Sequence, residues 1–136
     1  MPITRIYRKA GEPTASIPLY LCQQTQEALP DMWGRLPVED MREELRQDIE
    51  ARDRFEYLVS DDATLKAMMI IALDYTPHYG SYLAPLYAFS TEKGALSGAW
   101  RWMKQIAKLL KCDNYLITRQ TGDNKITTRK VKVKND

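Results

Sequence analysis

We expect an α+β fold with a mostly antiparallel, twisted sheet and helices on both of its faces, and three observations predict it. Several short stretches alternate apolar and polar residues, others carry apolar residues at helical spacing, and turn residues separate them. The strand patterns in the middle of the chain follow one another with only turns between them, which favours antiparallel pairing. The expected order of elements is β-α-α-β-β-β-α-β-β.

The N-terminal part of the chain predicts one strand followed by one helix. Residues 3–8 alternate apolar and polar side chains, and a glycine and a proline then interrupt the strand. Ser16 is of a residue type that commonly caps a helix, and Pro18 is tolerated in a first turn. We therefore expect a helix from Ser16 to Leu29, ended by Pro30.

A second helix is expected after a loop at residues 31–36. Pro37 suits its first helical position, and the acidic residues after it complement the helix dipole. Apolar side chains then recur every three or four residues, which predicts an amphipathic helix whose carboxylates form the exposed face. The apolar positions are Val38, Met41, Leu45 and Ile49.

Three strand patterns come next, at residues 55–59, 65–75 and 82–90, with turn residues between them. They are typical of an antiparallel meander. The middle pattern is apolar at consecutive positions, so we expect a central strand that is covered on both faces. Pro85 lacks the N–H group that a sheet ladder needs, which indicates an edge or a bulge, and bulges are frequent beside ligand sites.

The third helix has the clearest pattern in the chain. Its apolar side chains fall at the spacing of one helix face, whereas its basic side chains face away. Residues 114–119 and 125–134 then predict a terminal hairpin around a turn at residues 121–124. The apolar positions of the helix are Leu96, Ala99, Trp100, Met103, Ile106, Ala107 and Leu110, and the basic ones are Arg101, Lys104, Lys108 and Lys111.

Length and composition fit one domain over residues 1–136 with a single core. The longest apolar run, Ala67 to Leu73, is far shorter than a membrane span, and the N-terminus lacks the layout of a secretory signal. We therefore expect a cytoplasmic or virion context without membrane attachment. Cys22 and Cys112 stand alone and far apart, which favours buried thiols over a disulfide framework or a zinc site.

The formal net charge of +2 is unevenly distributed. Acidic residues crowd the second expected helix, and basic residues crowd the C-terminal hairpin. The basic hairpin and the basic face of the third helix can contact phosphates, so nucleic-acid binding stays open as a function. A solvated strand face is the alternative explanation, because the hairpin lacks interleaved aromatic residues.

The most informative stretch for function is a strand that runs into a glycine-bearing turn and then into the third helix, at residues 86–99. Backbone N–H groups of such a turn and the positive end of the helix dipole converge on one point, where a pyrophosphate can bind. Lys93 adds a positive charge there. A tight turn, with Gly98 allowing close contact between helix and sheet, is the alternative explanation of the same residues.

The order of elements, together with the segment Lys93-Gly94-Ala95-Leu96-Ser97-Gly98, resembles the GNAT superfamily of N-acetyltransferases. That family binds coenzyme A between a splayed fourth and fifth strand, with the pyrophosphate on the loop before the next helix. The resemblance implies that Pro85 lies in the bulged fourth strand and that acetyl-CoA is the cofactor. The binding residues that it implies are Tyr87, Ala88, Phe89, Lys93, Gly94, Ala95, Leu96, Ser97, Gly98 and Ala99.

Two features depart from the family's pattern. Leu96 stands where a central glycine is expected, and a hairpin replaces the helix that usually follows the fifth strand and often carries a catalytic tyrosine. Asp74, at the end of the apolar strand, and His78, in the turn after it, are then the candidates for accepting a proton from an amine. Turn residues without a catalytic role are the alternative explanation of both, so whether the chain is an enzyme stays open.

Three functions follow from these observations. The first is an acetyl-CoA-binding protein of the acetyltransferase type. The second is a non-enzymatic structural or host-interaction protein, because the chain resembles small bacteriophage-encoded proteins with this fold. Trp102 points away from the buried helix face, and together with Tyr79 and Tyr82 it would then offer an aromatic surface to a protein partner or a second copy. The third function is nucleic-acid binding through the basic hairpin.

Overall fold

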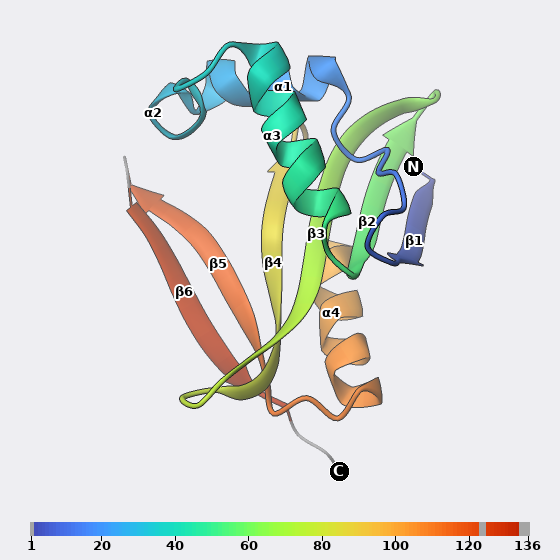
Figure 1. Ribbon diagram of the computed structural model, residues 1–136, viewed down its shortest axis with the longest axis vertical. Coiled ribbons are helices and arrows are strands. Elements are labelled where there is room, and N and C mark those ends of the chain that lie inside the picture. The colour runs from blue at the N-terminus through green and yellow to red at the C-terminus, as the bar shows by residue number, and fades with distance from the viewer. Residues whose placement is uncertain (1, 123–124, 134–136) are drawn as a thin grey trace.

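The computed structural model of the chain describes residues 2–122 and 125–133 (Figure 1). A six-stranded sheet has the order β1-β2-β3-β4-β5-β6, and all of its neighbouring strands are antiparallel except β4 and β5. This confirms the expected fold class. The strands are β1 (Ile3–Arg8), β2 (Arg54–Asp61), β3 (Thr64–Thr76), β4 (Gly80–Ser90), β5 (Asn114–Gly122) and β6 (Lys125–Lys132), and the helices are α1 (Leu19–Ala28), α2 (Pro30–Trp33), α3 (Val38–Glu50) and α4 (Ser97–Leu109).

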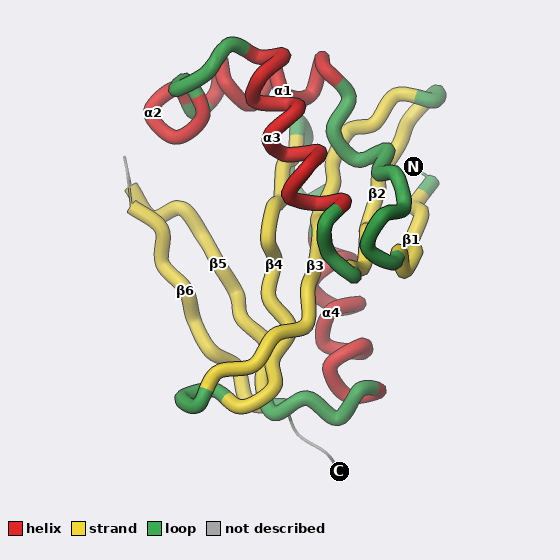
Figure 2. The backbone as a smooth tube through the Cα atoms, in the orientation of Figure 1, coloured by secondary structure: helices red, strands yellow, loops and turns green. Residues whose placement is uncertain are grey.

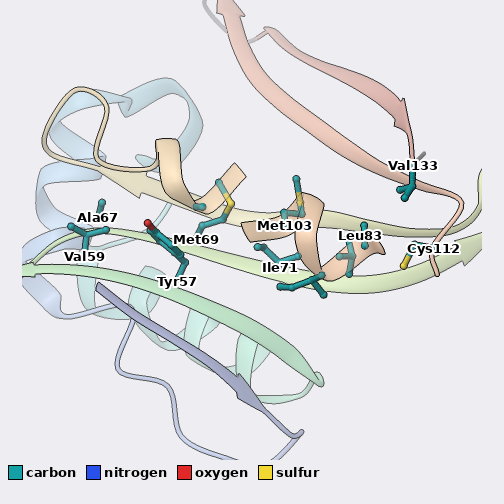
Figure 3. Packing of buried hydrophobic residues seen from close by; sticks show 12 residues of the cluster. Tyr57, Val59, Ala67, Met69, Ile71, Leu83, Met103, Cys112 and Val133 are labelled. Atoms are coloured by element: carbon teal, nitrogen blue, oxygen red, sulfur yellow. The ribbon is translucent and has the colours of Figure 1, made fainter. Parts of the chain in front are cut away.

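Different helices cover the two faces of the sheet, with α4 on one face and α1 and α3 on the other (Figure 2). Side chains alternate between the faces along a strand. Met69 and Ile71 of β3 therefore join the core under α4, shown in Figure 3, while Met68 and Ile70 join the core under α1 and α3. The expectation of a central strand covered on both faces is confirmed. It fails at the end of the strand, where Leu73 is 53% and Tyr75 68% exposed, because β3 there extends beyond its pairing with β2.

Helix α4 packs closely on the sheet at its first turn. A Cβ atom added to Gly98 would overlap the hydroxyl oxygen of Tyr57, a buried side chain of β2. The close contact expected as one explanation of this glycine is therefore confirmed. The apolar face of the helix is buried at Ala99, Met103, Ile106 and Ala107, and its basic side chains are exposed.

The first two helices differ in part from the expectation. Helix α1 begins after Pro18 without any side-chain cap, so the prediction that Ser16 caps it was wrong. Ser16 is instead buried, and its backbone N–H donates to the hydroxyl oxygen of Thr14 at 3.2 Å. Helix α1 ends with Leu29 as its C-cap, directly before Pro30 as expected. Pro30 also begins α2, because a first helical position needs no N–H donor. The loop expected at residues 31–36 is therefore partly helical.

Helix α3 confirms the amphipathic pattern that the sequence predicted. Met41, Leu45 and Ile49 are buried, and the acidic residues of its first turn are exposed. Pro37 lies directly before the helix and not within it. Its Asp48 accepts a hydrogen bond from Tyr87, a residue of the site described below.

A buried ion pair ties the N-terminal segment to β2. Arg54 donates from Nε to a carboxylate oxygen of Glu56 at 2.8 Å, and neither side chain is more than 1% exposed. The same guanidinium donates to the carbonyl oxygens of Lys9, Arg52 and Glu12 at 3.3, 3.3 and 2.7 Å. Buried charges are costly unless they are paired and fully hydrogen-bonded, and these contacts meet that requirement.

Strand β4 contains a β-bulge. Ile70 pairs with Tyr87 and Ile71 pairs with Pro85, which leaves Leu86 as the extra residue. This confirms one of the two explanations given for the proline. The extra residue also reverses the alternation, so that β4 contributes to the core under α4 before the bulge and to the core under α1 and α3 after it.

The terminal hairpin and the thiols agree with the expectation. Strands β5 and β6 pair with each other, while Asp123, Asn124 and Lys134 lie outside the described residues. Cys22 and Cys112 are both buried and free, which confirms the prediction of buried thiols. Over residues 2–122 and 125–133, no helix has the length and apolar character needed to span a bilayer.

Candidate functional site

Strands β4 and β5 run parallel but pair only briefly. Their register joins Tyr82 with Asn114 and Leu83 with Tyr115, and no later pair joins them along the described part of the chain. Figure 1 shows the hairpin of β5 and β6 leaning away from β4 beyond this point. The strands therefore form a V, and β4 after its bulge forms one arm of it.

A cavity of about 210 Å³ lies in this opening, and we call it the cleft. Strand β4 forms one wall, the β5–β6 hairpin forms the other, and the α1–α2 region and α4 contribute the rest. Most of these side chains are apolar, so the cleft suits an alkyl chain better than a charged group. The lining residues are Leu29, Met32, Trp33, Pro85, Leu86, Tyr87, Ala88, Phe89, Trp100, Thr118 and Ile126.

Helix α2 contributes an aromatic side chain that the sequence analysis missed as a site residue. The ring centroid of Trp33 lies 5.1 Å from that of Phe89, edge to face, and 6.2 Å from that of Tyr87. These contacts hold the indole against β4 beside the cleft. Pro30 was the available signal, since proline favours the first position of a helix that would end at this tryptophan.

The turn between β4 and α4 borders a second hollow, of about 520 Å³, which we call the turn hollow. Gly94 has a φ of 79°, and no atom lies within 4 Å of the place where its Cβ would be. Leu96 precedes the first turn of α4, and no side chain caps the helix. An uncapped helix N-terminus attracts anions through its N–H groups and its dipole. The lining residues are Ser90, Thr91, Glu92, Lys93, Gly94, Leu96, Ser97 and Trp100.

Two opposite charges border the turn hollow. Lys93 favours an anion there and Glu92 opposes it, and both residues are exposed. Because exposed charges of opposite sign largely offset each other, the positive end of the helix dipole is the main feature that favours an anion. The N–H groups of Ala95 and Ser97 already donate to the carbonyl oxygens of Glu92 and Gly94, at 3.4 and 3.2 Å.

The structure separates the expected cofactor-binding residues into three groups. Tyr87, Ala88 and Phe89 line the cleft, and Lys93, Gly94, Leu96 and Ser97 line the turn hollow. Ala95, Gly98 and Ala99 pack toward the sheet, and Leu96 also contacts the core under α4. Trp100 borders both the cleft and the turn hollow. The binding role of these residues stays a prediction.

Asp74 and His78 lie away from the cleft. Asp74 pairs with Tyr82, at the narrow end of the V, and its carboxylate accepts the backbone N–H of Tyr75 at 2.8 Å. Partial burial and then the Asp74 carboxylate raise the pKa of Tyr82. His78 is exposed in the turn between β3 and β4. Neither side chain lines the cleft, and their roles as proton acceptors stay predictions.

The hydroxyl of Tyr87 donates a hydrogen bond to the carboxylate of Asp48 on α3. This bond is the largest cause that lowers the pKa of Asp48, and Arg52 adds to the effect. Burial, followed by the bond to Asp48, raises the pKa of Tyr87 to about 12. Near neutral pH the pair therefore consists of an ionised carboxylate and a protonated phenol.

The three aromatic side chains expected to form one surface, those of Trp102, Tyr79 and Tyr82, contact different partners. Trp102 is half-buried rather than exposed, with its ring centroid 5.9 Å from that of Phe55 and 5.9 Å from that of Tyr57. Tyr79 and Tyr82 instead contact each other, at 5.5 Å between centroids. A protein partner or a second copy on this surface stays a prediction.

The fold has counterparts among solved structures. No protein-family model matches the sequence, and none of the curated proteins does. The chain is similar to a GNAT family acetyltransferase from Staphylococcus aureus subsp. aureus USA300_TCH1516, with a TM-score of 0.51 and 15% identity over 85% of this chain and 84% of that one. It is also similar to a possible acetyltransferase from Clostridium difficile 630, with a TM-score of 0.49 and 10% identity over 77% and 70% of the two chains. The first similarity shows the fold and confirms the expected GNAT-like architecture; an origin in a bacteriophage stays a prediction.

Proposed function

We propose that this chain binds an acyl-coenzyme A in the cleft and is a protein of the N-acetyltransferase type. One observation carries the proposal: β4 and β5 part after Leu83 and Tyr115, and the residues that follow in β4 line a cavity. That cavity adjoins the turn hollow, because Trp100 borders both. An elongated ligand with an apolar arm and an anionic end fits this arrangement.

The described residues fit the two parts of such a cofactor. The main chain at Tyr87, Ala88 and Phe89 has no strand partner toward β5, so its polar groups can pair with the amides of a pantetheine arm. The pyrophosphate would lie at Gly94 and Ser97, against the start of α4. A bound acyl-coenzyme A supplies a thioester, an activated acyl group for transfer to an amine.

Titration calorimetry with acetyl-CoA tests the binding. Leu96→Glu places a carboxylate in the turn hollow, where it repels a pyrophosphate, and we expect it to weaken binding at least roughly tenfold. Leu109→Glu is the matched control, because Leu109 lies at the other end of α4 and is 81% exposed. Absence of heat at millimolar acetyl-CoA, or equal weakening by both variants, would overturn the proposal.

Acetyl transfer requires its own experiment. The release of free coenzyme A thiol from acetyl-CoA is followed in the presence of amines, for the unchanged chain and for Asp74→Asn and His78→Ala. We propose these two side chains as the proton acceptors that the sequence suggested, and loss of release in either variant would support that role. Full release of the thiol by both variants would exclude these two side chains as proton acceptors.

A further inference from the structure

A third hollow lies beside the cleft, between α2, α3 and β4, with a volume of about 410 Å³. We call it the α3 hollow. It shares Met32, Trp33 and Tyr87 with the lining of the cleft, so the two cavities adjoin at these side chains. A molecule in the α3 hollow would therefore lie beside a ligand in the cleft. Its other lining residues are Arg35, Leu36, Met41, Glu44, Leu45 and Asp48.

The lining of the α3 hollow combines an apolar wall with aromatic rings and carboxylates. Met41 and Leu45 are buried and Leu36 is half-buried, which gives an apolar surface. The rings of Trp33 and Tyr87 lie against each other, tilted by 56°. Aromatic rings beside carboxylates attract organic cations, because the ring faces and the carboxylate oxygens both carry negative charge.

Asp48 is suited to hold a cation rather than to accept a proton. Its hydrogen bond from Tyr87 keeps it ionised, and the phenol stays protonated, so the pair keeps one negative charge across the physiological pH range. A general base would need a pKa near the working pH, which neither group has.

The arginines that now contact the carboxylates are exposed. Arg35 donates to Glu44 at 2.7 Å, with side chains 73% and 59% exposed, and Arg52 contacts Asp48 at 3.0 Å, with 45% and 38%. Exposed pairs of this kind contribute little to stability, so a ligand ammonium that is partly removed from water can replace them.

We propose that the α3 hollow binds an amphipathic amine, with its alkyl or aryl body on Leu36, Met41 and Leu45 and its ammonium beside Asp48 and the ring of Tyr87. This amine would be the acyl acceptor, and that role rests on the proposed function. In the transfer, the bound ammonium first gives one proton to solvent water or, through water, to the acceptors proposed above. The neutral amine attacks the thioester carbon, a C–N bond forms, the C–S bond breaks, and the leaving thiolate takes up the second proton released from nitrogen.

The test uses 2-phenylethylamine, with 2-phenylethanol as its neutral counterpart, and no coenzyme A. We expect the amine to shift the indole N–H signal of Trp33 in nuclear magnetic resonance spectra and to bind roughly tenfold more tightly than the alcohol. Asp48→Asn should remove this preference and leave binding of the alcohol unchanged. Asp40→Asn, an exposed carboxylate on the same helix outside the lining, should change neither.

Equal affinity for amine and alcohol, or equal effects of the Asp48 and Asp40 variants, would overturn the inference. If Asp48→Asn fails to fold, Glu44→Gln serves as the second variant and should lower the preference for the amine; an unchanged preference would contradict the inference. The proposed function is tested separately with acetyl-CoA alone. If acetyl-CoA binds and the amine does not, only this inference is overturned. If the amine binds and acetyl-CoA does not, the proposed function is overturned, and the acceptor role with it.

Discussion

Leu83 of β4 and Tyr115 of β5 form the last pair that joins these two parallel strands. Soon after it, Pro85 removes a backbone donor and the extra residue Leu86 forms the bulge in β4. A bulge bends its strand and increases the local twist, which gives a physical reason for the strands to part here. The cleft and the proposed cofactor site both depend on this divergence.

Filling the cleft should abolish ligand binding without unfolding the protein. Thr118→Trp places a large ring in the cavity from the β5 side, where Thr118 is half-buried. We expect acetyl-CoA affinity to fall at least roughly tenfold, while the free energy of unfolding changes by less than about 1 kcal/mol. Calorimetry and urea unfolding measure the two effects. Thr4→Trp, on β1 at the other edge of the sheet, is the control, and a similar loss of affinity there would contradict the site.

Removing a negative charge from the turn hollow should strengthen binding. Glu92→Gln leaves Lys93 without its opposing neighbour, so we expect acetyl-CoA to bind roughly twofold to fivefold more tightly at low salt. The gain should shrink as salt screens the charges. Glu39→Gln on α3 should have no effect. Unchanged affinity of the Glu92 variant at low salt would show that the anion does not lie in this hollow.

The glycine at the start of α4 should be sensitive to a single added carbon. Gly98→Ala drives a Cβ atom into the hydroxyl of Tyr57, and we expect it to destabilise the fold by about 1–3 kcal/mol in urea unfolding. Tyr57→Phe removes the overlapping oxygen, so the double variant should recover part of that loss. A double variant no more stable than the sum of the two single changes would argue against this contact.

Replacing one carboxylate of the buried ion pair should cost more than replacing an exposed one. Glu56→Ala leaves the Arg54 guanidinium without its counter-charge, and we expect a loss of about 3–5 kcal/mol. Glu44→Ala removes the partner of exposed Arg35 and should cost less than about 1 kcal/mol. Denaturant midpoints compare the two. Equal losses would mean that the buried pair is not closed in solution.

The bond between Tyr87 and Asp48 has a pH signature. Tyr87→Phe removes the largest cause of the lowered Asp48 pKa, so this carboxyl should titrate closer to its ordinary value. A carboxyl with a lowered pKa stabilises the fold above its unfolded pKa and loses that effect as pH falls through its folded pKa. The stability gap between the unchanged chain and the variant should therefore be widest near neutral pH and narrow in acid. Carboxyl carbon shifts follow the titration; an unmoved pKa would show that the bond does not form.

Local patterns predicted the elements of this fold well. The spacing of apolar residues predicted α4 and the fully buried part of β3, because each of these depends on neighbours in sequence. Pro85 predicted an edge or a bulge, and the structure has the bulge. The start of the first helix was predicted less accurately. Ser16 is of a residue type that caps helices, but in the structure it is buried and hydrogen-bonded to Thr14.

The features of the site that the sequence did not predict are contacts between distant segments. Tyr87 and Asp48 are 39 residues apart, and the contact of Trp33 with Phe89 joins a short helix to a strand after the bulge. The bulge reverses which side chains of β4 face α3, so alternation alone would have placed Tyr87 on the other face of the sheet. Asp74 and His78 were chosen for their chemistry, and their place at the narrow end of the V depends on how β4 meets β5.

Amide hydrogen exchange along β4 tests the central claim most directly. If the strands part after Leu83, amides from Ala84 to Ser90 that point toward β5 exchange rapidly in the free protein and become protected when acetyl-CoA is added. Slow exchange at every one of these amides without ligand would show that β4 is paired along its whole length. That result would contradict the cleft and the function proposed for it.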